Sequence, residues 1–502
     1  VTLKPISVTS GANTFSLSQA VAMWTLNPDK TFNSKIEAKD QGLDVAVTLG
    51  GSAVPGSATS GSVNVHALAT RLNGLVPNGP TWRDGALACR AVFTSQPPAL
   101  PVVGWTATGE GLAGDVPGLM KPIQAMAFDV GGDEHVIHVR SFVATVGSTT
   151  ANITGTVLQG KPLGTGAFRA SLDKLIAEEW APPPQPKGKT PAPAPASPAA
   201  PPPIPLKAFD GVVTIGELQS GKTIVRDVTV PVKYADGTLT AAPITGRIGT
   251  GTIGGELTLH DLVSSKPSYA LDMNVKRAPV EDLFGGLVPF KLPLTGFASG
   301  VVDLSGPGMP GQGAVDSLRG ALSGTVEDGK IIETPTILGL RNALGLAPSS
   351  GSAGDIVFKT VTHSLRIDQG RLLLDKVKGD LGKDLFEMAG SMGLDQSLNL
   401  DMLLRLAPER IKGGTALAQF ASYARDKDGR LPINVKITGS ALAPKISIKG
   451  GKTVDTAVKN LGQEVIKSLT ESGRHDSTRS DSTAAVDPLQ KGRDALKRLL
   501  GK

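Results

Sequence analysis

Apolar and polar residues alternate along much of the chain, and a period of two is the pattern of a β-strand with one buried face. Five sets of apolar residues show this alternation: Leu43, Val45, Val47 and Leu49; Val63, Val65 and Ala67; Leu398, Leu400 and Met402; Ile433, Val435 and Ile437; and Ile446 and Ile448. Polar turn sequences lie between such strands at residues 235–237, 327–329 and 368–370. The pattern predicts a series of antiparallel hairpins.

Helical periodicity is confined to a few segments. We expect short helices over residues 171–179, 279–286, 334–346 and 415–424. Towards the C-terminus, apolar residues recur every three or four positions from Val454 to Leu469, and Asp487 with Pro488 is typical of the start of a last helix. The chain is therefore expected to end in a helical, partly disordered tail over residues 450–502.

Three stretches share one order of elements, which is a strand, a polar turn, a strand, a glycine-containing kink and a third strand. They cover residues 127–157, 232–259 and 365–392. A repeated hairpin unit favours a long sheet that grows by addition over a compact globule. The predicted fold class is mainly β, with an elongated antiparallel sheet and few helices.

One proline-rich segment divides the predicted β-sheet region into two parts. The chain holds 37 prolines and 61 glycines in 502 residues, and 12 of the prolines fall within residues 181–206. Such a segment is expected to be an extended, polyproline-like linker or loop rich in Pro and Ala. The glycines are spread along the chain, as expected for bends and hairpins. The sequence thus predicts a β-rich region over 1–180, the linker, a second β domain over 207–449, and the tail.

Charge and hydropathy restrict the partners. The net charge is +6, and residues 449–502 alone carry 11 basic and 7 acidic side chains. A dense basic face is missing, so no nucleic-acid partner is predicted. The chain begins at Val1 without a signal peptide and without an apolar run of the ~18–20 residues that span a bilayer. We expect that an N-terminal segment was removed or that the chain is a fragment.

Two glycine-rich motifs match the sequences of nucleotide-binding patterns but lack the helix that such sites require. Residues 216–223 fit the P-loop pattern, and residues 249–254 fit G-x-G-x-x-G. Both patterns require a helix directly after the loop, because the helix N-terminus holds the phosphates. Alternating, β-branched residues follow each motif here. A hairpin turn and a bend in a sheet are the better predictions.

No active site is predicted from the remaining chemistry. Cys89 is expected to be a buried spectator, since a nucleophile would need a nearby base. His135 and His138 are three apart in a strand-like run, and the other histidines lie far apart without ligand spacing. The residues 426–429 are too short for an EF-hand loop. We therefore expect no enzyme activity, no cofactor and no metal.

The order of several phrases in the C-terminal half resembles a known family. These phrases are LTGFASGVVDLSG (294–306), VDSLRGALSGTVEDGKI (315–331), an apolar helix (334–346), LRIDQGRLLL (365–374), LPINVKITG (431–439) and APKISI (443–448). They resemble the C-terminal region of the AsmA-like family of bacterial envelope proteins, related to TamB and YhdP. The resemblance covers residues 207–449, and more loosely 1–180. The proline tract departs from the family pattern.

The resemblance implies a curved β-sheet whose hydrophobic inner face forms a groove or taco. It also implies a periplasmic protein anchored in the inner membrane by an N-terminal helix that this chain lacks. The implied function is phospholipid transport or outer-membrane homeostasis, with phospholipids and other envelope proteins as partners. Alternation supplies the candidate groove residues: Leu365, Ile367, Leu372, Leu374, Leu398, Leu400, Met402, Ile433, Val435 and Ile437.

The same aliphatic residues would also suit a closed sandwich core. A scaffold that adds strands to outer-membrane protein clients would instead need polar inner positions and free sheet edges, and a repetitive adhesin would need more regular, polar repeats. The last helix offers a candidate contact with an anionic membrane or a partner, through Leu496, Lys497, Arg498, Leu499 and Leu500.

Overall fold

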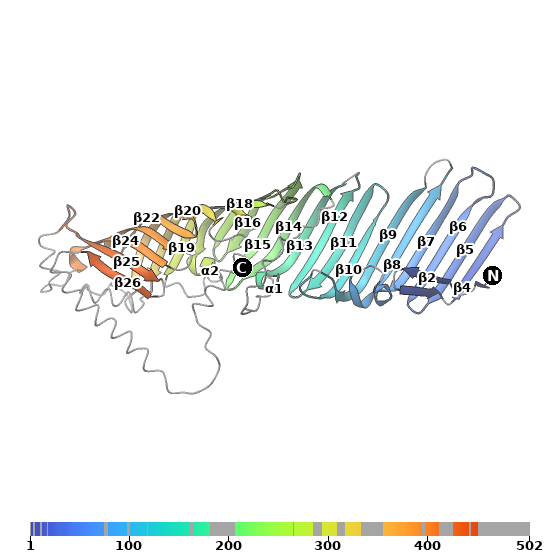
Figure 1. Ribbon diagram of the computed structural model, residues 1–502, viewed down its shortest axis with the longest axis horizontal. Coiled ribbons are helices and arrows are strands. Elements are labelled where there is room, and N and C mark those ends of the chain that lie inside the picture. Colours follow the sequence, from blue (N-terminus) through green and yellow to red (C-terminus); the bar gives the residue numbers. More distant parts are fainter. Residues whose placement is uncertain are drawn as a thin grey trace, which may run out of the picture. The chain divides into compact units, whose positions relative to one another are not determined.

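A computed structural model of the chain shows a mainly β fold, and its strands form an open, curved sheet, as the sequence predicts. The structure describes residues 2–3, 6–10, 13–17, 19–74, 79–97, 101–117, 119–160, 164–180, 206–264, 266–284, 294–308, 317–332, 355–393, 397–410, 425–440 and 443–449. Within these residues, 24 strands belong to one hydrogen-bonded sheet (Figure 1). Two compact units divide it: Val1–Gln219 with Arg226–Ala241, and Ser220–Val225 with Ala242 onward.

The first unit is built from successive antiparallel hairpins. Its strands before the proline tract are β1 (Thr2–Leu3), β2 (Ile6–Ser10), β3 (Asn13–Leu17), β4 (Gln19–Leu26), β5 (Thr31–Asp40), β6 (Leu43–Ser52), β7 (Thr59–Leu68), β8 (Thr81–Ser95), β9 (Val102–Asp115), β10 (Ile123–Gly132), β11 (Val136–Val146), β12 (Thr149–Leu158) and β13 (Gly164–Ile176). A 3₁₀-helix (Ala69–Leu72) follows β7, and α1 (Ala177–Trp180) follows β13. β1 pairs with β4, whereas β2 and β3 form a separate hairpin.

After the tract come β14 (Leu206–Ser220), β15 (Thr223–Ala235) and β16 (Thr238–Ile248). The second unit continues with β17 (Gly251–His260), β18 (Ser268–Pro279), α2 (Val280–Phe284), β19 (Leu294–Pro307), β20 (Arg319–Ile331), β21 (Ile356–Asp368), β22 (Arg371–Leu381), β23 (Asp384–Gly393), β24 (Ser397–Leu406), a 3₁₀-helix (Pro408–Arg410), β25 (Leu431–Ser440) and β26 (Ala443–Lys449). From β17 onward each strand pairs antiparallel with the next.

Two of the three predicted turns are confirmed. Residues 236–237 join β15 to β16, and residues 369–370 join β21 to β22. The prediction of a turn at 327–329 is wrong, because β20 runs through it. Asp328 takes a positive φ of 50° beside a register shift between β19 and β20, so this polar triplet forms a bulge and the strand continues.

The helix predictions have mixed outcomes. The helix expected over 279–286 is confirmed for Val280–Phe284, which form α2, whereas Pro279 ends β18 and residues 285–286 lie outside the described residues. The helix expected over 171–179 is wrong for its first six residues, which extend β13. Ser171 and Leu172 pair with β12, and the extension continues along β14 as far as Ile176. Pairing with β14 outweighs the helical spacing there, and only Ala177–Trp180 is helical. The segments 334–346 and 415–424 and the tail lie outside the described residues.

One pairing departs from the antiparallel pattern. β13 and β14 run parallel, and their register extends from Gly164 opposite Leu206 to Ile176 opposite Gln219. Parallel neighbours need a connection that returns along the length of the strand. The proline tract therefore joins two adjacent strands of the same unit.

Some glycines allow close approach between strands. Gly390 in β23 has a φ of 132°, and a Cβ built there would lie 2.2 Å from the carbonyl oxygen of Asn399 on β24. A side chain at this position would collide with backbone that cannot rotate away.

We expect Gly390→Val to lower the free energy of unfolding by about 1–3 kcal/mol, through backbone strain and this collision. Urea unfolding followed by circular dichroism measures it. The matched control is Ala389→Val, because Ala389 is an exposed residue of the same strand and valine is readily accommodated in a β-strand. Equal stability of the two variants would contradict the role of Gly390.

Candidate functional site

The candidate site of the second unit is one face of its sheet. Opposed residues on antiparallel strands project to the same side, so the registers trace rows of side chains across the strands. One row contains Ile446, Ile437, Leu400, Gly390, Leu374, Leu365, Leu322, Val302 and Met273. The adjacent row contains Gly439, Leu398, Met392, Leu372, Ile367, Gly320, Leu304, Leu271 and Leu257. We call this side the apolar face of the second unit.

All ten groove residues proposed from the sequence lie on this face. Leu400, Ile433 and Val435 are buried, and the other seven are half-buried. They share this face because they are opposed across neighbouring strands: Met402 is opposite Val435, and Leu374 is opposite Leu365. Alternation along four separate strands thus brings ten aliphatic side chains together on one surface.

Burial on this face increases towards one end of the strands. Leu406 and Leu431, which are opposed where β24 and β25 meet their connection, have no exposed surface. They belong to one cluster with Phe386, Leu404 and Ile433. Side chains nearer the other strand ends, such as Leu398, are half-buried. Among the described residues, therefore, no second layer closes over the whole face.

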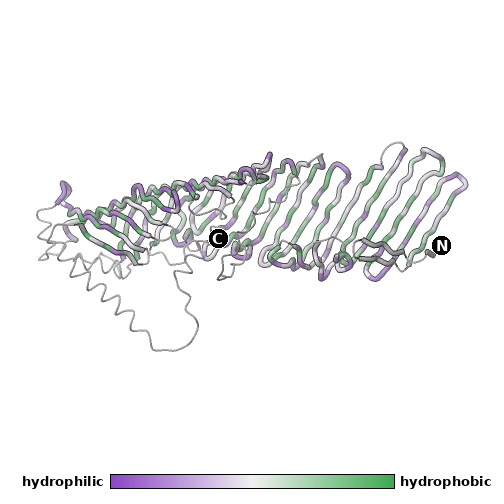
Figure 2. The backbone as a smooth tube through the Cα atoms, viewed as in Figure 1, coloured by the Kyte–Doolittle hydropathy of each residue, from purple (hydrophilic) through white to green (hydrophobic). Residues whose placement is uncertain are grey.

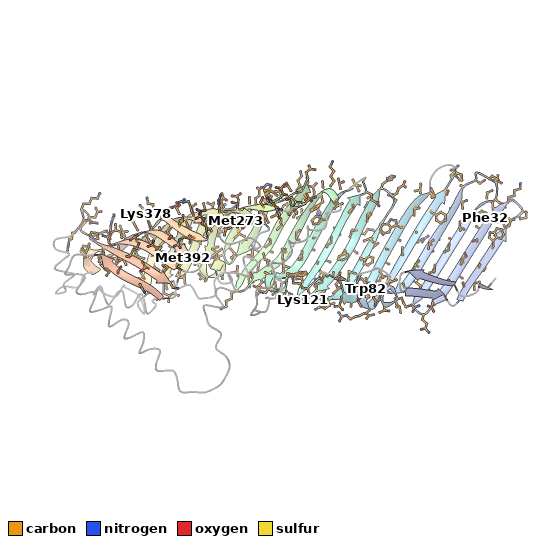
Figure 3. All side chains as sticks on the ribbon, viewed as in Figure 1. Phe32, Trp82, Lys121, Met273, Lys378 and Met392 are labelled. Carbon is orange, nitrogen blue, oxygen red and sulfur yellow. The ribbon has the colours of Figure 1, made fainter. Side chains whose placement is uncertain are left out.

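The opposite face of the same strands is polar. Lys436 pairs with Asp401 at 2.7 Å, and the Arg366 guanidinium binds the Asp375 carboxylate through two hydrogen bonds of 2.6 and 2.7 Å. These bonds hold the pKa of Asp375 below its ordinary value. Figure 3 labels one side chain from each face, Met392 from the apolar face and Lys378 from the polar face. These ion pairs lie opposite the aliphatic rows, so the two sides of the sheet differ strongly.

The first unit has an apolar face of its own. One row passes through Ala22, Ile36, Val47, Val63, Ala91, Trp105, Gly132, Ile137, Val157, Gly166 and Phe209. A buried cluster around Leu112, Ile123 and Met126 lies at one end of the strands. Towards the other end Trp24 is 71% exposed and Leu26 is 57% exposed. Figure 2 shows hydrophobic and hydrophilic residues alternating along these strands.

The expectation that Cys89 is buried is wrong, because its side chain is exposed. Cys89 lies on the apolar face between Val65 on β7 and Ala107 on β9. The expectation assumed that an apolar face is covered by a second layer. In the described part of the chain, nothing covers this position.

A histidine interrupts the apolar face of the second unit. His363 is opposite Val377 on β22 and Gly324 on β20. Its Nδ1 is shielded and has no hydrogen-bond partner among the described residues. Burial lowers the pKa of the imidazole, because the charged form loses hydration on this surface.

The glycine-rich motifs do not form nucleotide sites. Residues 216–223 span the end of β14, a turn and the start of β15, which confirms the predicted hairpin. Residues 249–250 form the turn between β16 and β17 and residues 251–254 are the start of β17, so no helix follows. The described residues contain no group of His, Cys, Asp and Glu side chains that could hold a metal ion. They also contain no helix of the length and apolarity that crossing a membrane requires.

The sequence did not single out large parts of the two faces. Trp105, Phe93 and Phe142 on the first unit, and Met273 and Leu304 on the second, belong to the same rows as the aliphatic sets. Their strands carry glycine and alanine at alternate positions, which weakens the period-two signal. The candidate contact residues Leu496, Lys497, Arg498, Leu499 and Leu500 lie outside the described residues.

No family model, curated protein or solved structure matches this chain. The two-sided sheet is therefore the basis for the functional argument.

The lowered pKa of His363 predicts a pH-dependent stability. The unfolded chain, with an ordinary imidazole pKa of about 6.5, binds the proton more readily than the folded chain. We expect the free energy of unfolding to decrease as pH falls from 7 to 5, and His363→Leu to flatten that part of the profile. Denaturant titrations at each pH measure both. An unchanged slope in the variant would contradict the assignment to His363.

Proposed function

We propose that the protein binds lipid acyl chains along the apolar faces of its sheet and carries or shields phospholipid in a bacterial cell envelope. The observation that carries the proposal is the pair of unlike faces on β21–β26. One face holds aliphatic side chains and glycine across several strands, and the other holds ion pairs. This arrangement resembles the lipid groove expected for the AsmA-like family.

Aliphatic rows suit acyl chains for a physical reason. Contact between methylene groups is non-directional, and each methylene removed from water contributes ~0.8 kcal/mol. Sliding along such a surface exchanges one aliphatic contact for another, so no single position holds the ligand. Half-buried residues such as Leu372 and Leu398 leave apolar area for a ligand to cover.

The resemblance to the AsmA-like family supplies the proposed setting. It implies a periplasmic protein associated with the inner membrane, with a role in lipid transport or outer-membrane homeostasis. A scaffold that presents sheet edges to client proteins is the alternative from the sequence. The aliphatic rows favour lipid transport, because a scaffold of that kind needs polar inner positions.

A photoreactive residue placed at successive positions of β24 tests the proposal. We expect crosslinks to phospholipid from positions 398, 400 and 402 and none from 399, 401 and 403, because alternate residues project to opposite faces. The sharpest control is position 403, where an aliphatic leucine faces the polar side. Crosslinks without this alternation, or none at any position, would contradict lipid binding at this face.

A charge on the apolar face should weaken lipid binding. We expect Leu398→Asp to lower the affinity for a fluorescent phospholipid roughly tenfold or more, because the carboxylate loses hydration when an acyl chain covers it. Leu403→Asp on the opposite face is the matched control and should bind like the parent protein. Circular dichroism of both variants verifies the fold. Equal affinities would count against the proposed face.

A further inference from the structure

A third row of opposed residues on the apolar face of the second unit contains His363. From β25 to β17 its members are Val435, Met402, Met388, Val377, His363, Gly324, Gly300, Val275 and Ile253. Along β21 the imidazole lies between Val361 and Leu365, which project to the same side and pack against the buried cluster of this unit. The row is therefore apolar except at His363.

Two glycines lie beside the imidazole on the neighbouring strands. Gly324 on β20 is directly opposite His363, and Gly300 on β19 is directly opposite Gly324. A Cβ at Gly324 would lie 2.2 Å from the Ser299 carbonyl oxygen, and a Cβ at Gly300 would lie 2.3 Å from the Ser323 carbonyl oxygen. Because backbone atoms at these distances exclude any side chain, no side chain from β19 or β20 can cover the imidazole within this row. An aliphatic ligand that lies across the row meets His363 at this point.

Among the described residues of the two neighbouring strands, no charged side chain projects to the side on which His363 lies. The nearest residues on that side are Leu322, Gly324 and Val326 on β20 and Leu374, Val377 and Gly379 on β22. Lys376 and Lys378 on β22 and Glu327 on β20 belong to the polar face. Farther away, at the start of β23, the buried Asp384 carboxylate accepts the Ala407 N–H at 2.7 Å. A proton on the imidazole therefore has no neighbouring carboxylate to compensate its charge.

An acyl chain and a proton compete at this position. The imidazole Nδ1 is already shielded and has no hydrogen-bond partner among the described residues, and burial lowers the pKa of His363. An acyl chain that covers the ring removes more water from it, and the charged form loses more free energy than the neutral form when water is removed. By linkage, the affinity for lipid is highest above the imidazole pKa and decreases as the pH falls through that pKa.

We propose that His363 makes lipid binding on the apolar face of the second unit depend on pH, so that acyl chains bind beside the neutral imidazole and are released when it is protonated. This inference rests on the lipid binding proposed above. The aliphatic residues of the face supply the contact area, and His363 supplies the response to acid, because it alone among the described residues of β20, β21 and β22 is titratable near neutral pH and projects to this side.

Crosslinking to phosphatidylcholine from a photoreactive residue at position 374, titrated with lipid at pH 7.5 and 5.0, tests the proposal on this face. Phosphatidylcholine carries the same charge at both pH values. We expect an affinity about three- to tenfold lower at pH 5.0, since one proton changes an affinity by at most about tenfold per pH unit. His363→Leu should bind equally at both. His138→Leu is the matched control and should keep the parent response, because His138 is exposed and projects away from the apolar face of the first unit.

A permanent charge at the same position supplies a second measurement at pH 7.5. His363→Arg should bind about three- to tenfold more weakly than the parent, because arginine stays protonated. Thr362→Arg, on the adjacent residue that faces the polar side, should bind like the parent. Circular dichroism verifies the fold of each variant at each pH.

The outcomes separate this inference from the function on which it rests. A folded parent that gives no lipid crosslink at pH 7.5 would contradict lipid binding on this face, and the pH response with it. A parent that binds lipid with the same affinity at both pH values would overturn the role of His363 and leave lipid binding intact. An unchanged pH response in His363→Leu, or parent-like binding by His363→Arg, would overturn that role as well.

Discussion

Hydrophobic burial constrains this protein more than any other interaction, because each unit has a sheet with one aliphatic face and that face needs a cover. The strands meet part of the need themselves, where clusters such as Leu406 with Leu431 form at the strand ends. Elsewhere the aliphatic rows are only half-buried by described residues. Lipid acyl chains would remove this uncovered apolar area from water.

The two faces of the sheet differ in polarity, and the positions of the ion pairs maintain this difference. Ion pairs such as Lys436–Asp401 and Arg366–Asp375 are confined to the polar side. Exposed ion pairs contribute little to stability. Their main effect is to keep that side hydrated and unlike the aliphatic side. Glycines such as Gly390 allow neighbouring strands to approach where a side chain would collide.

The sequence predicted the fold class and the members of one face because both depend on a local signal. Alternation places Leu365, Leu400 and Val435 each on the aliphatic face of its own strand. Only the pairing registers show that these faces lie on the same side of the sheet. The failures required non-local information. The triplet at 327–329 forms a bulge because β20 continues to pair with β19 beyond it. Residues 171–176 extend a strand because they pair with β14, a strand that lies beyond the proline tract in sequence. The exposure of Cys89 depends on what covers a face, which no local pattern encodes.

The parallel step between β13 and β14 was also beyond the sequence pattern. A proline tract predicts an extended segment, but not whether it separates two bodies or joins neighbouring strands. The pairing of Gly164 with Leu206 shows that the tract joins neighbouring strands. Aromatic residues there, Phe168 and Phe209, are separated by the whole tract in sequence and meet through this pairing.

Lipid extraction and quantitative mass spectrometry of the protein, purified from a bacterial envelope without detergent exchange, test the central claim most directly. If acyl chains cover the aliphatic faces, diacyl phospholipid is recovered in at least stoichiometric amount, and Leu398→Asp reduces it while Leu403→Asp does not. Recovery of no phospholipid from folded protein, or equal recovery from both variants, would contradict the claim.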